Sequence, residues 1–198
     1  MKQIILASNN EHKLKELKQK LKDLDINVIS QKEAGYDIDV EETGTTFREN
    51  SEIKAKALNE ILNSPVIADD SGLEIDALNG MPGVYSHRFA GENATDADRI
   101  NKVLSLMKDV VEEKRTARFK TVICYIDEKK EMHFFEGIAE GKIGLVPKGN
   151  NGFGYDPIFI YNGRTFAEMT GEEKNMVSHR GRAIEELVKY LKNIQENY

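Results

Sequence analysis

Two adjacent carboxylates, Asp69 and Asp70, follow the apolar run Val66–Ala68 and precede Ser71 and Gly72. Side-by-side carboxylates repel each other, and at the end of a buried strand both would also lose solvation. A magnesium ion would relieve that cost, since Mg²⁺ binds one or two carboxylates together with substrate phosphates and keeps several of its waters. A solvated turn that ends the strand would relieve it as well. These residues alone predict a metal site or a turn, with neither favoured.

Residues 8–13, SNNEHK, could bind phosphate. They lie between an apolar segment and a segment with helical periodicity. The backbone N–H groups of a helix start would point outward there, at the positive end of the helix dipole. Ser8 and Asn10 add neutral donors, and Lys13 adds a mobile charge. Taken alone, this stretch is better explained as a capped helix with a surface lysine, which is the commoner arrangement.

Further carboxylates and a lysine occur in residues 41–54. Glu41 and Glu42 precede a predicted helix, and Lys54 lies farther along that helix. Lys54 could reach an anion if its side of the helix faces a cleft. Taken alone, a solvated loop and a surface helix explain the pattern better.

Residues 152–157, GFGYDP, could hold a nucleobase. Glycines on both sides of Phe153 allow its ring to project from a tight loop, and stacking of a base on such a ring contributes about 1–3 kcal/mol. The proline after Asp156 restricts the backbone of that residue. A turn that carries a core phenylalanine is a serious alternative.

Three cationic or polar donors, Lys174, His179 and Arg180, lie in residues 172–183, EEKNMVSHRGRA. They stand in or beside a predicted helix start, where they could donate to the carbonyl oxygens of a base. The alternative is that they are exposed charges on a loop and a helix.

The elements that must position these residues follow from hydrophobic periodicity and cap signals. Strands are predicted at residues 3–8, 27–31, 66–68, 73–78, 119–127, 131–141 and 157–161. Helices are predicted to begin at Asn10, Thr46, Thr95 and Ser178, the second with a possible capping box. Residues 33–45 and 148–157 are predicted loops. Helices alternate with strands early and a hairpin comes later, which predicts an α/β fold with a mixed central sheet and flanking helices.

The bulk properties exclude some classes of protein. The chain has 198 residues, which suits one large domain or two closely joined lobes, and its formal net charge is −6. That charge argues against a protein that coats a nucleic acid polymer, because binding through phosphates needs a basic face. No apolar run approaches the length that spans a membrane, and the N-terminal apolar segment is too short for a signal peptide.

The single cysteine and three of the histidines are not expected to do chemistry. Cys124 lies in the apolar stretch TVICYI, which predicts a buried strand thiol rather than a nucleophile. With one cysteine no intramolecular disulfide can form, so a reducing cytoplasm is the expected compartment. His12, His87 and His133 show no metal-ligand spacing.

Jointly, the motifs and their order are far more specific than any one of them. The chain contains Ser8-x-Asn10-x-x-Lys13-x-x-Glu16, then ETGxTFxEN, ADDSGL, GxPGxYSxR, FGYDPIF and EEKNxxSHRxxA. In this it resembles the inosine triphosphate pyrophosphatase family, the non-canonical purine nucleoside triphosphate pyrophosphatases also called dITP/XTP pyrophosphatases. The resemblance covers essentially the whole chain. One departure is Ser8-Asn9, where many relatives carry Thr-Gly.

The resemblance implies a single domain over residues 1–198, with a mixed α/β fold of two lobes around a nucleotide cleft. It also implies a homodimer. The implied reaction is the Mg²⁺-dependent hydrolysis of ITP, dITP or XTP to the monophosphate and pyrophosphate, which cleanses the nucleotide pool. The expected partner is therefore a small-molecule triphosphate, with no nucleic acid polymer and no membrane.

The resemblance also assigns roles to residues. Asp70 is the implied catalytic base and a metal ligand, and Glu42 is the second metal ligand, with Glu41 as the alternative. Lys13 and Lys54 would hold the departing pyrophosphate. The implied substrate-binding residues are Ser8, Asn9, Asn10, Glu11, His12, Lys13, Lys54, Ser71, Phe153, Gly154, Tyr155, Asp156, Lys174, His179 and Arg180.

Two other interpretations remain open at this point. One is a Maf-type nucleotide pyrophosphatase with another base preference, against which the FGYD and SHR motifs argue. The other is a nucleotide-binding sensor that does not turn over its ligand. The presence of Asp70, Glu42 and Lys13 together argues against such an inactive site.

Overall fold

The computed structural model describes residues 2–196, which divide into two compact units. The first unit comprises the chain up to Asp70, residues 121–137 and the chain from Gly181 onward. The second comprises Ser71–Lys120 and Ile138–Arg180. The chain passes between the units inside three strands, β3 (Val66–Ile75), β4 (Thr116–Ile126) and β5 (Met132–Ile143), and again near the start of the last helix, α5 (His179–Glu196).

The strands form a mixed sheet in the order β2-β1-β3-β4-β5-β6-β7. β1 pairs in parallel with β2 and β3, whereas β6 pairs antiparallel with β5 and β7. The predicted α/β class with a mixed sheet is therefore confirmed. The strands are β1 Lys2–Leu6, β2 Ile26–Ser30, β3 Val66–Ile75, β4 Thr116–Ile126, β5 Met132–Ile143, β6 Phe159–Tyr161 and β7 Arg164–Thr165. The helices are α1 Glu11–Leu21, α2 Phe47–Leu62, α3 Asp96–Leu106, α4 Gly171–Val177 and α5 His179–Glu196.

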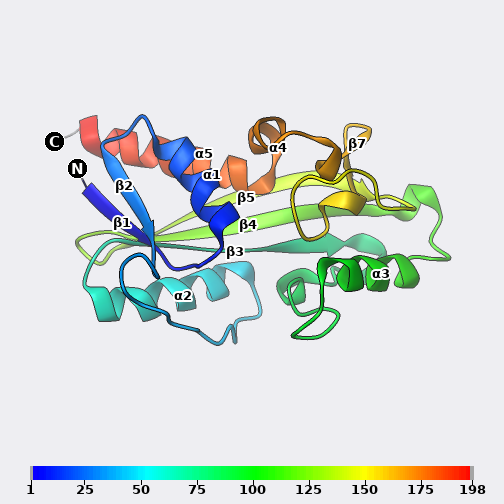
Figure 1. Cartoon of the computed structure of the whole chain (residues 1–198), viewed down its shortest axis with the longest axis horizontal. Helices are drawn as coiled ribbons and strands as arrows, with labels where there is room; N and C mark the ends of the chain where they lie inside the picture. The colour runs from blue at the N-terminus through cyan, green and yellow to red at the C-terminus, as the bar shows by residue number, and fades with distance from the viewer. Residues whose placement is uncertain (1, 197–198) are drawn as a thin grey trace. The chain divides into compact units, whose positions relative to one another are not determined.

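In the first unit, helices cover both faces of the sheet (Figure 1). Leu17 and Leu21 of α1 and Leu187 of α5 pack on one face, in a cluster that includes Ile4 of β1. Leu58 of α2 belongs to a separate cluster on the other face. Burial on both faces explains why the inner strands read as nearly continuous apolar runs.

The helix starts in the first unit are set by local hydrogen bonds, as predicted. The side chain of Asn10 accepts from the backbone N–H groups of His12 and Lys13. Thr46 and Glu49 form a complete capping box at the start of α2. Both arrangements satisfy N–H groups that have no partner inside the helix, so they define where each helix begins.

In the second unit, the core forms around the other ends of the long strands. Phe119, Phe159 and Phe166 make ring contacts with one another, with ring centroids 4.6–5.8 Å apart. Figure 1 shows α3 on one side of these strands and α4 on the other. The fully buried guanidinium of Arg115 donates to the carbonyls of Met107, Val110, Ile143 and Gly144, which ties the end of α3 to the strands.

One strand prediction is wrong in a way that matters for the site. The sequence pattern predicts separate strands at residues 66–68 and 73–78, with the acidic pair between them. Instead β3 is a single strand from Val66 to Ile75, and residues Asp76–Leu78 form a short 3₁₀ turn. Asp69 and Asp70 therefore lie within a buried strand. This is tolerated because each carboxylate meets a lysine from a helix, as described below.

Other local predictions are confirmed or refined. Ser178 does precede the last helix, but a short helix that was not predicted, α4, comes before it and ends at Val177. Cys124 is buried in β4, and burial raises the pKa of its thiol to about 12, as expected for an unreactive cysteine. Among residues 2–196, no helix has the length and apolar character needed to cross a lipid bilayer.

Candidate active site

In the first unit, lysines from two helices contact the two adjacent aspartates of β3. The ammonium of Lys13 lies 3.0 Å from a carboxylate oxygen of Asp69. Lys54 donates to Oδ1 of Asp70 at 3.2 Å and to Oε1 of Glu42 at 2.8 Å. Two lysines thus face three carboxylates, which leaves one net negative charge, and the pairing lowers the cost of burying these charges.

Each lysine is positioned by an element whose start is set locally. Lys13 lies in the first turn of α1, just after its cap at Asn10. Lys54 lies in α2, and its side chain is only 14% exposed. Asp69 and Asp70 come from β3, which β1 holds in parallel register through Ile5 and Leu6. The lysines and aspartates therefore come from two helices and a strand, and Glu42 comes from the loop before α2.

Burial and neighbouring charges shift the pKa values of Asp70 and Lys54 in opposite directions. Burial raises the pKa of Asp70, and Lys54 opposes that rise without cancelling it. For Lys54, burial acts against the charged form, but the neighbouring carboxylates, led by Asp70, outweigh it and raise its pKa. Lys54 therefore stays protonated at neutral pH. Asp70 becomes a more basic carboxylate than an exposed aspartate, which suits proton transfer near neutral pH.

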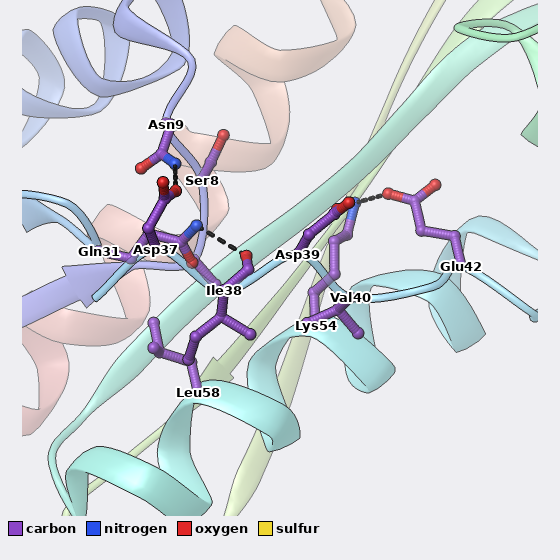
Figure 2. Close-up of a pocket in the computed structure, with 11 residues that line it drawn as sticks. Ser8, Asn9, Gln31, Asp37, Ile38, Asp39, Val40, Glu42, Lys54 and Leu58 are labelled. Carbon is purple, nitrogen blue, oxygen red and sulfur yellow. Dashed lines mark hydrogen bonds and ion pairs between the residues drawn. The ribbon is translucent and has the colours of Figure 1, made fainter. Parts of the chain in front are cut away.

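The donor set of this cluster fits a hard divalent ion. The ammonium of Lys54 already bridges Glu42 and Asp70, so this position accepts positive charge. Figure 2 shows its contact with Glu42. Carboxylate oxygens are the ligands that Mg²⁺ prefers. Glu41, the alternative ligand, is exposed, whereas Glu42 contacts the same lysine as Asp70. Glu42 is therefore the better-placed partner.

A hollow of about 300 Å³ lies beside this cluster, lined in part by Ser8, Glu42 and Lys54 (Figure 2). The predicted loop at residues 33–45 forms one wall. Asn9 donates to Asp37 at 2.8 Å, and this contact holds the loop to the segment before α1. The departure from the Thr-Gly of many relatives thus gives the loop an additional hydrogen bond.

The second unit brings together most of the residues predicted to bind the base. Asp156 accepts from Lys174 Nζ at 2.6 Å and from the backbone N–H of Phe153 at 2.9 Å. Lys174 Nζ lies 4.8 Å from the centroid of the Phe153 ring, and the Arg180 guanidinium lies 5.7 Å from it. Arg180 also donates to the hydroxyl of Ser71 at 3.0 Å. An aromatic ring flanked by cationic donors results.

The loop around Phe153 has little freedom. At Gly152, whose φ is +74°, a Cβ would lie 2.0 Å from the carboxylate of Asp156, so only glycine fits. The backbone N–H of Gly154 donates to Asp96 at 2.7 Å. Burial raises the pKa of Asp156, and Lys174 opposes the rise.

Comparisons with known proteins agree over almost the entire length of the chain. Residues 4–190 match the model of the Ham1 family. A dITP/XTP pyrophosphatase from Clostridium perfringens is 51% identical over 203 aligned residues, covering 98% of this chain and 99% of the relative.

The chain belongs to the Ham1 family.

Solved structures of Ham1 proteins agree with the fold described above. A HAM1 protein from Coxiella burnetii matches with a TM-score of 0.91 at 47% identity, covering 98% of this chain and all of that one. The Ham1 protein of Staphylococcus aureus matches with a TM-score of 0.89 at 43% identity, covering 97% and 99%. The resemblance inferred from the motifs is therefore confirmed, and these matches favour it over the Maf-type alternative.

Other predicted site residues of this Ham1 chain have surroundings of their own. Glu11 and His12 are exposed at the start of α1. Tyr155 is buried, and its hydroxyl donates to the carbonyl of Ser86 at 2.8 Å. His179 is stacked on Phe119, with ring centroids 4.7 Å apart and an angle of 11°. The roles assigned to these residues stay predictions.

Sequence analysis missed two contacts of the Ham1 site. Asn50, the last residue of ETGxTFxEN, donates to Asp70 at 3.2 Å. Asp69, whose role was ambiguous, contacts Lys13. The acidic pair and the motif asparagine were visible in the sequence. Their partners were not, because they come from other elements of the fold.

In residues 2–196, one further group of possible metal ligands consists of Asp127, Glu131 and His133, at the turn between β4 and β5. Asp127 accepts from the backbone N–H groups of Lys129 and Glu131 and lies 3.1 Å from His133 Nε2. These contacts identify the group as a hydrogen-bonded hairpin turn.

Proposed function

We propose that this chain hydrolyses non-canonical purine nucleoside triphosphates such as ITP, dITP and XTP. The products are the nucleoside monophosphate and pyrophosphate. The observation that carries the proposal is a cluster of ion pairs in the first unit, made by Lys13, Asp69, Lys54, Asp70 and Glu42. The lysines of this cluster can bind phosphates. Its carboxylates can bind a metal ion and accept a proton. The relative from Clostridium perfringens, a dITP/XTP pyrophosphatase, supports the substrate class.

Lys13 and Lys54 bind the phosphates in this proposal. Both ammonium groups lie on flexible stems and are held by carboxylates. A triphosphate with its own cation can take over these ammonium groups, since that cation would replace Lys54 beside Asp70 and Glu42. Charge that develops on the leaving pyrophosphate is then stabilised by preorganised cations, which is how enzymes lower the barrier of such steps.

Asp70 and Glu42 would hold Mg²⁺, the ion expected from the donor set. When bound, Mg²⁺ supplies Lewis-acid polarisation of a phosphoryl oxygen and a lower pKa for a coordinated water. Asp70 accepts the proton of the attacking water. Its raised pKa makes it a better proton acceptor than an exposed aspartate, provided that it is ionised when the substrate binds.

Residues of the second unit select the base. Phe153 provides a ring for stacking, and Lys174, His179 and Arg180 provide donors. Hypoxanthine and xanthine present an acceptor oxygen at the 6-position, whereas adenine presents an amino donor there. Donors matched to the oxygen would be left unpaired against adenine. A site of this kind discriminates by roughly 10⁴ or more.

The remaining expectations belong to the same proposal. The whole chain acts as one catalytic domain, which the match of residues 4–190 to a single family model supports. The protein is a homodimer and works in the cytoplasm, where its nucleotide substrates are and where Cys124 stays reduced.

Product analysis tests the function directly. The purified protein is incubated with Mg²⁺ and ITP, XTP, dTTP or ATP, and pyrophosphate and monophosphate are quantified. We expect ITP and XTP to give equal amounts of both products and ATP to react far more slowly. Release of orthophosphate, or ITP binding without turnover, would contradict the proposal. A preference for dTTP would point to a different base specificity.

A further inference from the structure

Asn50 contacts both sides of the metal-binding cluster through one buried amide. The residue is 0% exposed, in α2 one turn after the cap at Thr46. Its Nδ2 donates to Oδ2 of Asp70 at 3.2 Å, and its Oδ1 accepts from the backbone N–H of Gly44 at 2.8 Å. Since Lys54 donates to Oδ1 of Asp70, both oxygens of that carboxylate have a nitrogen donor.

The segment after Glu42 is packed tightly on this amide. A Cβ at Gly44 would lie 2.6 Å from Oδ1 of Asn50 and 2.7 Å from Cβ of Glu49. The backbone can therefore approach α2 this closely only with glycine at this position. Glu49 also accepts from the backbone N–H groups of Thr45 and Thr46. The segment that carries Glu42 is thus held to the same turn of α2 that contacts Asp70.

We propose that Asn50 is a positioning residue that holds the Asp70 carboxylate and the Glu42 segment in one arrangement. The inference rests on the proposed function, since it assigns Asn50 to the same metal-binding cluster. Only an amide of this length has a donor for the carboxylate and an acceptor for the backbone N–H. Aspartate would place an acceptor against Asp70. Leucine would remove the donor to Oδ2 of Asp70 and the acceptor for the backbone N–H of Gly44.

The test compares Asn50→Ala with Asn59→Ala, a matched control on the same helix. Asn59 is also a buried α2 asparagine, but it donates to the backbone carbonyl of Ser64, away from the cluster. Asn50→Leu preserves the shape without the hydrogen bonds. Gly44→Ala disturbs the contact from the loop side and leaves the chemistry of the Asn50 side chain unchanged.

Two readouts are measured on each folded variant. The first is the Mn²⁺ affinity of the protein without nucleotide, measured from the free-ion signal in electron paramagnetic resonance. The second is kcat and KM for ITP. Partners behind metal ligands change affinity or activity by about 10- to 100-fold when removed. We expect losses of that size in Mn²⁺ affinity and kcat for both Asn50 variants and for Gly44→Ala. Asn59→Ala should match the wild type in both readouts, even where its thermal midpoint falls.

The inference is overturned if Asn50→Ala and Asn50→Leu bind Mn²⁺ like the wild type. It is also overturned if Asn59→Ala loses as much as Asn50→Ala at equal thermal stability, because a general defect of α2 would then explain both. The Mn²⁺ readout does not depend on which nucleotide is cleaved. Failure of the wild type to release pyrophosphate from ITP would overturn the proposed function instead.

Discussion

At the scale of single residues, the carboxylate of Asp70 is buried in a strand and surrounded by donors. It accepts from Lys54 and Asn50, yet burial still raises its pKa. A carboxyl group whose pKa is raised in the folded state binds its proton more tightly when folded than when unfolded. Its charge therefore does not add to stability at neutral pH. A residue kept in this state is better explained by chemistry than by stability.

Asp70→Asn separates the two explanations. The amide keeps the shape but cannot bind the metal as a carboxylate does or accept the proton. We expect kcat for ITP to fall by about 10²- to 10⁴-fold, the contribution of a general base. The thermal midpoint at pH 7 should not fall. A variant that keeps its activity, or that loses both activity and stability, would contradict the catalytic role.

Lys13 tests the phosphate site. Its ammonium contacts Asp69 in the absence of substrate, so Lys13→Ala should impair triphosphate substrates severely. Binding of the monophosphate product, which lacks the pyrophosphate, should weaken much less. Isothermal titration with IMP and steady-state kinetics with ITP give the comparison. Equal losses for both ligands would indicate a folding defect instead.

Arg180 tests the choice of base. Its guanidinium lies near Phe153 and donates to Ser71. A hydrogen bond from a charged donor contributes about 1.5–3 kcal/mol, so Arg180→Ala should lower kcat/KM for ITP by about 10- to 100-fold. The poor rate with ATP should change little. An equal decrease for ITP, XTP and ATP would mean that Arg180 serves the phosphates or the scaffold.

At the scale of elements, α2 and β3 contribute equally to the cluster in the first unit, and β3 carries Asp69 and Asp70. Helix α2 carries Asn50 and Lys54, and its start is set by the capping box of Thr46 and Glu49. Hydrogen bonds from the backbone N–H groups of Thr45 and Thr46 lower the pKa of Glu49. Because Asn50 and Lys54 lie on the same helix as this cap, a substitution of Thr46 or Glu49 should also shift the positions of these two side chains.

Removal of the cap should act on stability first. Thr46→Ala should lower the free energy of unfolding by about 1 kcal/mol, as is typical for a lost N-cap.

Because the pKa of Glu49 is lowered on folding, the contribution of its carboxylate to the free energy of unfolding is complete above the ordinary pKa of a glutamate. It is lost as the pH falls through the lower, folded value. Glu49→Gln should therefore flatten the acid limb of stability, measured by urea denaturation between pH 3 and pH 7. An unchanged limb would contradict this role.

At the scale of the whole molecule, the expected homodimer can be measured directly. Light scattering coupled to size-exclusion chromatography should give twice the mass of the chain at micromolar concentration. Dilution followed by an activity assay would show whether assembly is needed for turnover. A monomer with full activity would contradict the proposal that the dimer is the working form.

What the sequence by itself determined is local. The helix starts at Asn10, Thr46 and Thr95 were predicted because a cap joins a side chain to an N–H group only two or three residues away. The buried thiol of Cys124 followed from its apolar neighbours. The family followed from the order of short motifs, each of which can be recognised without knowing what it touches.

Only the tertiary structure decided how the acidic pair is accommodated. The sequence left a metal site and a turn equally open, because it does not show which charges face Asp69 and Asp70. In the fold, α1 brings Lys13 to one carboxylate, and α2 brings Lys54 and Asn50 to the other. With these partners the strand can continue through both aspartates, where isolated burial of two charges would have forced it to end. The role of Asn50 is likewise a property of packing, since its partners lie in a loop and a strand that no local pattern connects to it.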